Sequence, residues 1–180
     1  MKKLYIGIIF AFGAYTSYAQ NYEFQDVIDI ERLPVISQDN TGTCWSFSTS
    51  SFVESEIIRL TGRKIDVSEM YQARTTYIAK AENYVMRQGK ANFSEGALAH
   101  DVFNSIQQYG LVPNVIFDGL NEGQTKHNHE EMDAVLVAML KVYAENPGKK
   151  LSTNWKPAIN AVLDIYLGSI TTIFEFEGKN

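Results

Sequence analysis

Cysteine, histidine and basic residues are all scarce in this sequence. Its 180 residues contain one cysteine, Cys44, and three histidines. A lone cysteine has no disulfide partner within its own chain, so the fold must be stabilised by packing. The 16 basic residues are outnumbered by 21 acidic ones, which argues against a nucleic-acid partner. With 45% hydrophobic and 12% aromatic residues, the composition predicts a globular domain rather than disorder.

The first nineteen residues have the organisation of a cleaved export signal. Lys2 and Lys3 precede an apolar run over residues 4–14, and Ser17 and Ala19 are small residues where a signal peptidase reads them. The alternative is a membrane anchor, but the run is shorter than the roughly 20 residues that span a bilayer. Cleavage removes two basic residues and no acidic ones, which changes the net charge from −5 to −7. We therefore expect an exported protein, periplasmic or secreted, without a stable membrane anchor.

Hydrophobic spacing and turn residues in the mature part, residues 20–180, predict a helix-rich domain. The expected helices cover residues 44–61, about 68–89, 97–109, 130–144 and 155–167. Aromatic and acidic residues alternate over 173–177, which predicts a strand. We find no partner strand of comparable quality, so this part of the sequence looks like the beginning of a longer fold.

Cys44 opens the first predicted helix, directly after the turn-forming residues 39–42. The positive end of a helix macrodipole favours a thiolate over a thiol, and a thiolate is a nucleophile. The backbone N–H of Cys44 and the side-chain amide of Gln38, six residues upstream, are candidate donors to an oxyanion. Acyl transfer also needs a general base, normally histidine. The alternative is that Cys44 is a buried core thiol.

The stretch from Gln38 to Phe47, QDNTGTCWSF, resembles the active-site segment of the papain superfamily of cysteine peptidases. One glycine in the loop, and no second cysteine before Cys44, make it most similar to the bleomycin hydrolase and aminopeptidase C branch. Further similar segments follow in the same order at residues 66–71, 96–97, 109–113 and 167–176. The resemblance covers about residues 34–178. It implies an α+β papain-like fold, present here mainly as the helix-rich nucleophile lobe with a terminal strand of the β-rich lobe.

The resemblance also implies a thiol peptidase, aminopeptidase-like, that hydrolyses peptide bonds through a thioester on Cys44. Gln38 would contribute to the oxyanion hole, and Gly96, Ala97 and Trp45 would lie on the substrate side. Ala97 departs from a glycine pair in the family, and Trp45 is expected to pack beneath the helix rather than to contact substrate. No cofactor or metal is implied. Peptides are the expected partners, and homo-oligomer formation by a full-length protein stays open.

The catalytic histidine and asparagine of the family lie far downstream of the cysteine, and the sequence has no match to them. We therefore interpret it as an N-terminal fragment, inactive when isolated. His100 is expected to have a packing or surface role. His127 and His129 are expected to be solvated residues at a helix start, the alternative being a metal site.

Two other functions are compatible with the sequence. One is a non-catalytic secreted binding module that retains the papain-like helical lobe. The other is a purely structural secreted helical protein, for which the spacing of Gln38 and Cys44 would be a coincidence.

Overall fold

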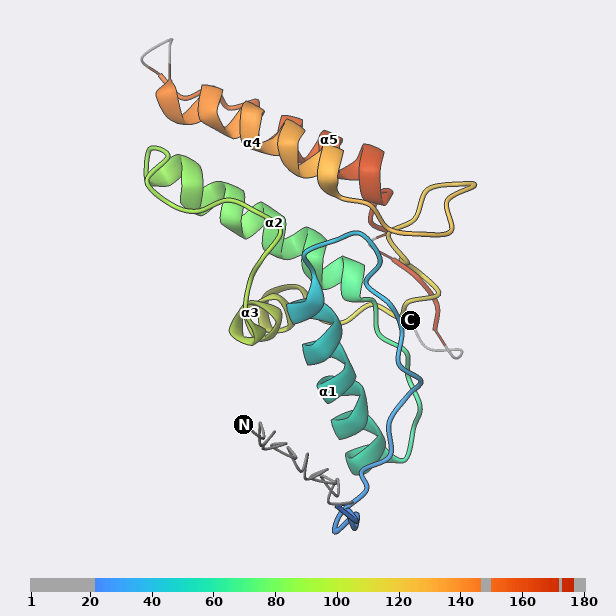
Figure 1. Cartoon of the computed structure of the whole chain (residues 1–180). Coiled ribbons are helices and arrows are strands. Elements are labelled where there is room, and N and C mark those ends of the chain that lie inside the picture. Colours follow the sequence, from blue (N-terminus) through green and yellow to red (C-terminus); the bar gives the residue numbers. More distant parts are fainter. Residues whose placement is uncertain (1–21, 147–149, 172, 177–180) are drawn as a thin grey trace, which may run out of the picture.

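The computed structural model describes residues 22–146, 150–171 and 173–176, which form five helices. The expected signal segment, residues 1–19, lies outside the described residues. Within them, no helix is both long and apolar enough to cross a membrane. The helices are shown in Figure 1: α1 (Cys44–Thr61), α2 (Glu69–Met86), α3 (Ala99–Tyr109), α4 (Glu130–Glu145) and α5 (Trp155–Leu167).

The predicted helices are confirmed, and their ends follow from local chemistry. Ser68 caps α2, because its hydroxyl accepts the Tyr71 N–H at 2.9 Å. Gly62 ends α1 in the left-handed conformation, with φ of 69°. The third helix begins two residues later than predicted, since the Leu98 N–H donates to the Asp101 carboxylate at 2.9 Å.

The core forms around α2, which contacts all four other helices. Figure 1 shows α4 and α5 on one side of α2, and α1 and α3 on the other. Between α2, α4 and α5 lie the fully buried side chains of Leu136, Leu140 and Leu163. Burial of one such side chain contributes about 1.5–3 kcal/mol to folding. The packing therefore provides the stabilisation expected of a chain without an internal disulfide.

The predicted strand over 173–177 is wrong for residues 173–176, and residue 177 lies outside the described part. Ile173 is 84% exposed, and the backbone of residues 173–176 joins no ladder, with only Phe176 in an isolated bridge. A strand is stable only when a neighbouring strand satisfies its backbone groups. The described residues contain only isolated β-bridges, such as Asn40 with Asn128 and Val67 with Pro113. The described part of the chain is therefore all-α instead of α+β.

Candidate active site

Cys44 is the first residue of α1, and its side chain is exposed. The core-thiol alternative is therefore wrong. The Thr43 side chain does not cap the helix, because its hydroxyl lies 2.5 Å from the Thr41 hydroxyl instead. The first turn of α1 carries no acidic residue. The positive end of the helix dipole is thus open to an anion beside the thiol.

The residues before Cys44 form a compact loop, residues 38–43, which we call the oxyanion loop after the role predicted for Gln38. The Gln38 side-chain amide donates to the Thr41 carbonyl at 2.5 Å, and the Thr41 hydroxyl donates back to the Gln38 carbonyl at 2.9 Å. Asp39 has a positive φ of 54°, which this closed turn imposes. One amide hydrogen of Gln38 is therefore used inside the loop. The amide carries a second hydrogen, and its role as an oxyanion donor stays a prediction.

The segment around His127 is hydrogen-bonded to the oxyanion loop. The Asn40 N–H donates to the His127 carbonyl at 3.1 Å, and the His129 N–H donates to the Asn40 carbonyl at 3.3 Å. The His127 N–H also donates to the Asp39 carboxylate at 3.1 Å. These contacts join segments about 88 residues apart, so no local spacing in the sequence could have revealed them.

The expectation that His127 and His129 are solvated is wrong. His129 is only 2% exposed, and its Nδ1 lies 3.2 Å from the Tyr77 hydroxyl. Burial, and to a lesser extent the neighbouring His127, lower the pKa of His129 to about 4. Burial also lowers the pKa of the half-buried His127. Both imidazoles therefore belong to the packing beneath the oxyanion loop.

The predicted substrate side meets the oxyanion loop through Glu95, a residue that the sequence analysis missed. The Glu95 carboxylate accepts the Gly42 N–H at 2.5 Å, and its carbonyl accepts the Trp45 indole N–H at 2.9 Å. Trp45 is 6% exposed and lies in the core. Gly96 is exposed and Ala97 half-buried. The position of Glu95, directly before Gly96, was the only sequence signal for it.

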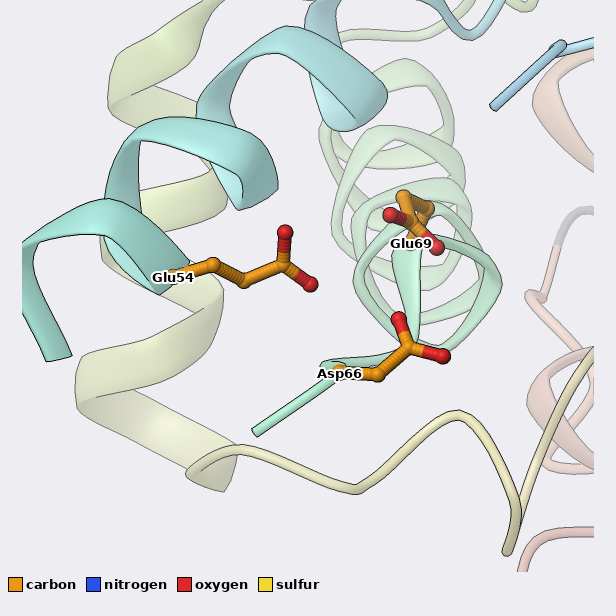
Figure 2. A group of neighbouring side chains, drawn as sticks. All are labelled: Glu54, Asp66 and Glu69. Carbon is orange, nitrogen blue, oxygen red and sulfur yellow. The ribbon is translucent and has the colours of Figure 1, made fainter. Parts of the chain in front are cut away.

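A cluster of acids forms a second candidate site, which the sequence analysis also missed. The carboxylate oxygens of Glu54, Asp66 and Glu69 lie within 4.8 Å of one another, and Figure 2 shows them converging from α1, from the segment before α2, and from the first turn of α2. They line a cavity of about 460 Å³, together with Leu33 and Phe47 among others. Glu54 and Glu69 are buried, whereas Asp66 is exposed.

The buried acids of this cluster favour their protonated forms. Burial raises the pKa values of Glu54 and Glu69 to about 7 each. A hydrogen bond from the Val67 N–H to Glu54, 2.9 Å long, opposes the shift of that group. Grouped carboxylates can hold a divalent cation. They can also share protons when buried together, and the direction of both shifts favours protons.

None of the three histidines in the described residues is hydrogen-bonded to Cys44. His100 lies exposed on α3, with its Nε2 3.4 Å from the Asp101 carboxylate. His127 and His129 make the contacts given above. The arrangement thus presents an accessible thiol and candidate oxyanion donors, while no local imidazole is positioned as its base.

Comparisons with known proteins support the fold. No family model matches the sequence, and no curated protein matches it. Among solved structures the chain is similar to PepW from Lactobacillus rhamnosis HN001, with a TM-score of 0.54 at 15% identity over 79% of this chain. PepW is a papain-like member of the aminopeptidase C family. At this identity the likeness shows the fold alone. The chain spans 38% of the PepW chain.

Proposed function

We propose that this chain is the nucleophile-bearing part of an exported, papain-like thiol peptidase of the aminopeptidase type. The observation that carries the proposal is the exposed thiol of Cys44 at the start of α1, directly after the oxyanion loop. The fold shared with part of PepW supports it. The active-site resemblance of residues 38–47 supports it independently, because it was found in the sequence and not in the helix packing.

The proposed reaction is acyl transfer through sulfur. The Cys44 thiolate attacks the peptide carbonyl carbon, a C–S bond forms, and the carbonyl electron pair moves onto oxygen. The backbone N–H of Cys44 and the Gln38 amide stabilise that oxyanion. Collapse breaks the C–N bond as the amine takes a proton from an imidazolium, and water then hydrolyses the thioester. We assign the imidazole to no residue of this sequence.

Export and a peptide substrate are parts of the same proposal. Export is supported by the pattern of residues 1–19, with its basic start, apolar run and small residues before the cleavage point. A peptide substrate is supported by the exposed Gly96, whose segment is joined to the oxyanion loop through Glu95. An extended peptide can bind such a segment through its main chain.

A second candidate is a non-catalytic secreted binding module. It is favoured by one observation, the engagement of all three histidines away from Cys44. Such a module would bind peptides on the 94–97 segment without activating the thiol.

Covalent labelling of Cys44 tests the two candidates against each other. We expect a peptidyl epoxide at about pH 6 to add one equivalent to the full chain, at least about tenfold faster than to a free-cysteine peptide. Intact-mass spectrometry measures both rates, and the Cys44→Ser variant is the control that should not react. Labelling at the rate of the free peptide, together with reversible peptide binding, would contradict the peptidase and support the module.

A further inference from the structure

Glu95 makes two different contacts with the residues around Cys44. Its carboxylate accepts the Gly42 N–H in the oxyanion loop, and its main-chain carbonyl accepts the indole N–H of Trp45, the second residue of α1. A hydrogen bond to an ionised acceptor is stronger than one between neutral groups. One residue therefore joins the loop before the thiol and the helix after it to the segment before Gly96.

The 94–97 segment is itself fixed from the other side by α2. The Lys80 ammonium donates to the carbonyls of Ser94 and Gly96, which flank Glu95. Burial lowers the pKa of Lys80, and its ammonium lies 5.9 Å from the Phe93 ring centre. Lys80 thus holds the backbone on both sides of Glu95, which leaves the Glu95 side chain little freedom to retreat from the loop.

The oxyanion loop and Glu95 are also in close steric contact. A Cβ atom built on Gly42 would lie 2.9 Å from the Glu95 Cβ, closer than real Cβ atoms approach. Only glycine permits this approach of the loop backbone to Glu95. The hydrogen bond from Gly42 to Glu95 and this close packing therefore both fix the position of the oxyanion loop relative to Glu95.

The Glu95 charge acts on the interior beneath the loop. Burial raises the pKa of Tyr77, and the Glu95 charge raises it further. The pKa of Asp133 is raised by the same two causes in the same order. Glu95 thus faces the buried polar groups under the oxyanion loop rather than bulk solvent alone.

We propose that Glu95 is a positioning residue, which locks the oxyanion loop to the 94–97 segment so that donors at Cys44 and a peptide bound at Gly96 keep one fixed geometry. The inference rests on the proposed function. Oxyanion donors stabilise charge only when they are held at the position where it develops. Glu95 contributes by fixing Gly42, two residues before the nucleophile, and does not touch the reacting atoms.

A peptidyl aldehyde separates this role from the reactivity of the thiol. The Cys44 sulfur adds to the aldehyde carbon, and the carbonyl electron pair moves onto oxygen, which stays anionic or takes a proton from water. The stability of this adduct depends on the oxyanion donors, whereas alkylation by iodoacetamide does not. The ratio of aldehyde affinity to alkylation rate therefore reports the positioning of the loop.

In the full chain, Glu95→Ala should weaken aldehyde binding by about tenfold, as expected for a lost hydrogen bond to a charged group. Its alkylation rate by iodoacetamide at about pH 6 should stay within about twofold of the wild type. Glu95→Gln should restore most of the affinity, because its amide oxygen can accept the Gly42 N–H. Glu122→Ala, an exposed glutamate in another loop, is the matched control.

Hydrogen exchange of the Gly42 amide provides a readout independent of any ligand. The amide should exchange slowly in the wild type and in Glu95→Gln, and at least about tenfold faster in Glu95→Ala. Equal exchange and equal aldehyde affinity in the wild type and Glu95→Ala would overturn the inference alone. Equal losses of aldehyde affinity and alkylation rate would also overturn it, because Glu95 would then act on the thiol. A wild type that neither binds the aldehyde nor alkylates faster than a free-cysteine peptide would overturn the proposed function and the inference together.

Discussion

At its first turn α1 carries an exposed thiol and no acidic side chain, whereas ten residues further along it buries the carboxyl of Glu54 beside Asp66 and Glu69. Additional negative charge is therefore favoured at the first turn of α1 and disfavoured near Glu54. The first turn offers unpaired backbone N–H groups and the positive end of the dipole, which favour an incoming anion. Around Glu54 there are more carboxyl groups than hydrogen-bond donors, so protonation of these carboxyl groups or binding of a cation is favoured.

The proposed role of Cys44 depends on this difference. A cysteine at position 44 lies at the helix end, beside which the first turn carries no acid, while a cysteine near position 54 would face two further acids. The three predictions that follow test whether each region depends on its own charge arrangement.

The largest effect is expected from Glu54→Ala, which removes the acceptor of the buried Val67 N–H. At about pH 5, where the carboxyl is protonated, we expect the free energy of unfolding to fall by about 2–4 kcal/mol. Glu54→Gln should lose less than half of that, because the amide oxygen can still accept. Urea denaturation measures both variants. A Glu54→Ala protein as stable as the wild type would show that the acid cluster contributes nothing to the fold.

A smaller effect is expected in the dependence of stability on pH. The folded pKa of Glu69 is raised to about 7, so between about pH 4.5 and 7 the unfolded chain releases its proton while the folded chain keeps it. The contribution of Glu69 to the free energy of unfolding is fully present below pH 4.5 and is lost as the pH rises through 7.

His129 changes the stability with pH in the opposite direction. The contribution of Glu69 is therefore isolated by comparing the wild type with Glu69→Gln, since His129 is present in both. Its pKa is lowered, so its contribution is lost as the pH falls from about 6.5 towards 4. We expect the unfolding free energy of Glu69→Gln, relative to wild type, to rise by about 1–3 kcal/mol between pH 4.5 and 7. Parallel stability curves for the two proteins would contradict the raised pKa.

The smallest effect is expected when an acid is added to the first region. Ser48 is exposed and lies four residues after Cys44, on the same face of α1. Ser48→Asp should slow alkylation of Cys44 at about pH 6 by roughly two- to fivefold, since a nearby carboxylate disfavours the thiolate. Ser55→Asp, two turns further along, is the control and should change the rate little. Equal rates in both variants would show that local charge does not govern the thiol.

The helices could be predicted from the sequence because their signals are local. Apolar residues at helical spacing, Ser68 before α2 and Gly62 after α1 all act within a few residues. The absence of a strand at 173–176 could not be predicted. Alternation of apolar and acidic residues shows that a segment can form a strand, but it does not show that a neighbouring strand is present. The helical fold is similar to part of PepW, and the roles predicted for Cys44 and Gln38 stay predictions.

Long-range contacts explain what the sequence analysis missed at the site. The acid cluster joins Glu54 to Asp66 and Glu69, which lie 12 and 15 positions further along the chain, beyond the end of α1. The contacts of His127 with Asp39 and of Glu95 with Gly42 bridge 88 and 53 positions. In a polar stretch of sequence, a buried histidine cannot be distinguished from a solvated one. His129 is buried because Tyr77 packs against it from α2, a contact that the local sequence does not reveal.

The alkylation rate of Cys44 by iodoacetamide at about pH 6 tests the central claim most directly, because it depends on the thiolate and on no other part of the proposed mechanism. We expect a rate constant at least about tenfold above that of a free-cysteine peptide under the same conditions, with one label on Cys44. A rate constant equal to that of the free peptide would contradict it, since the helix end would then provide no activation.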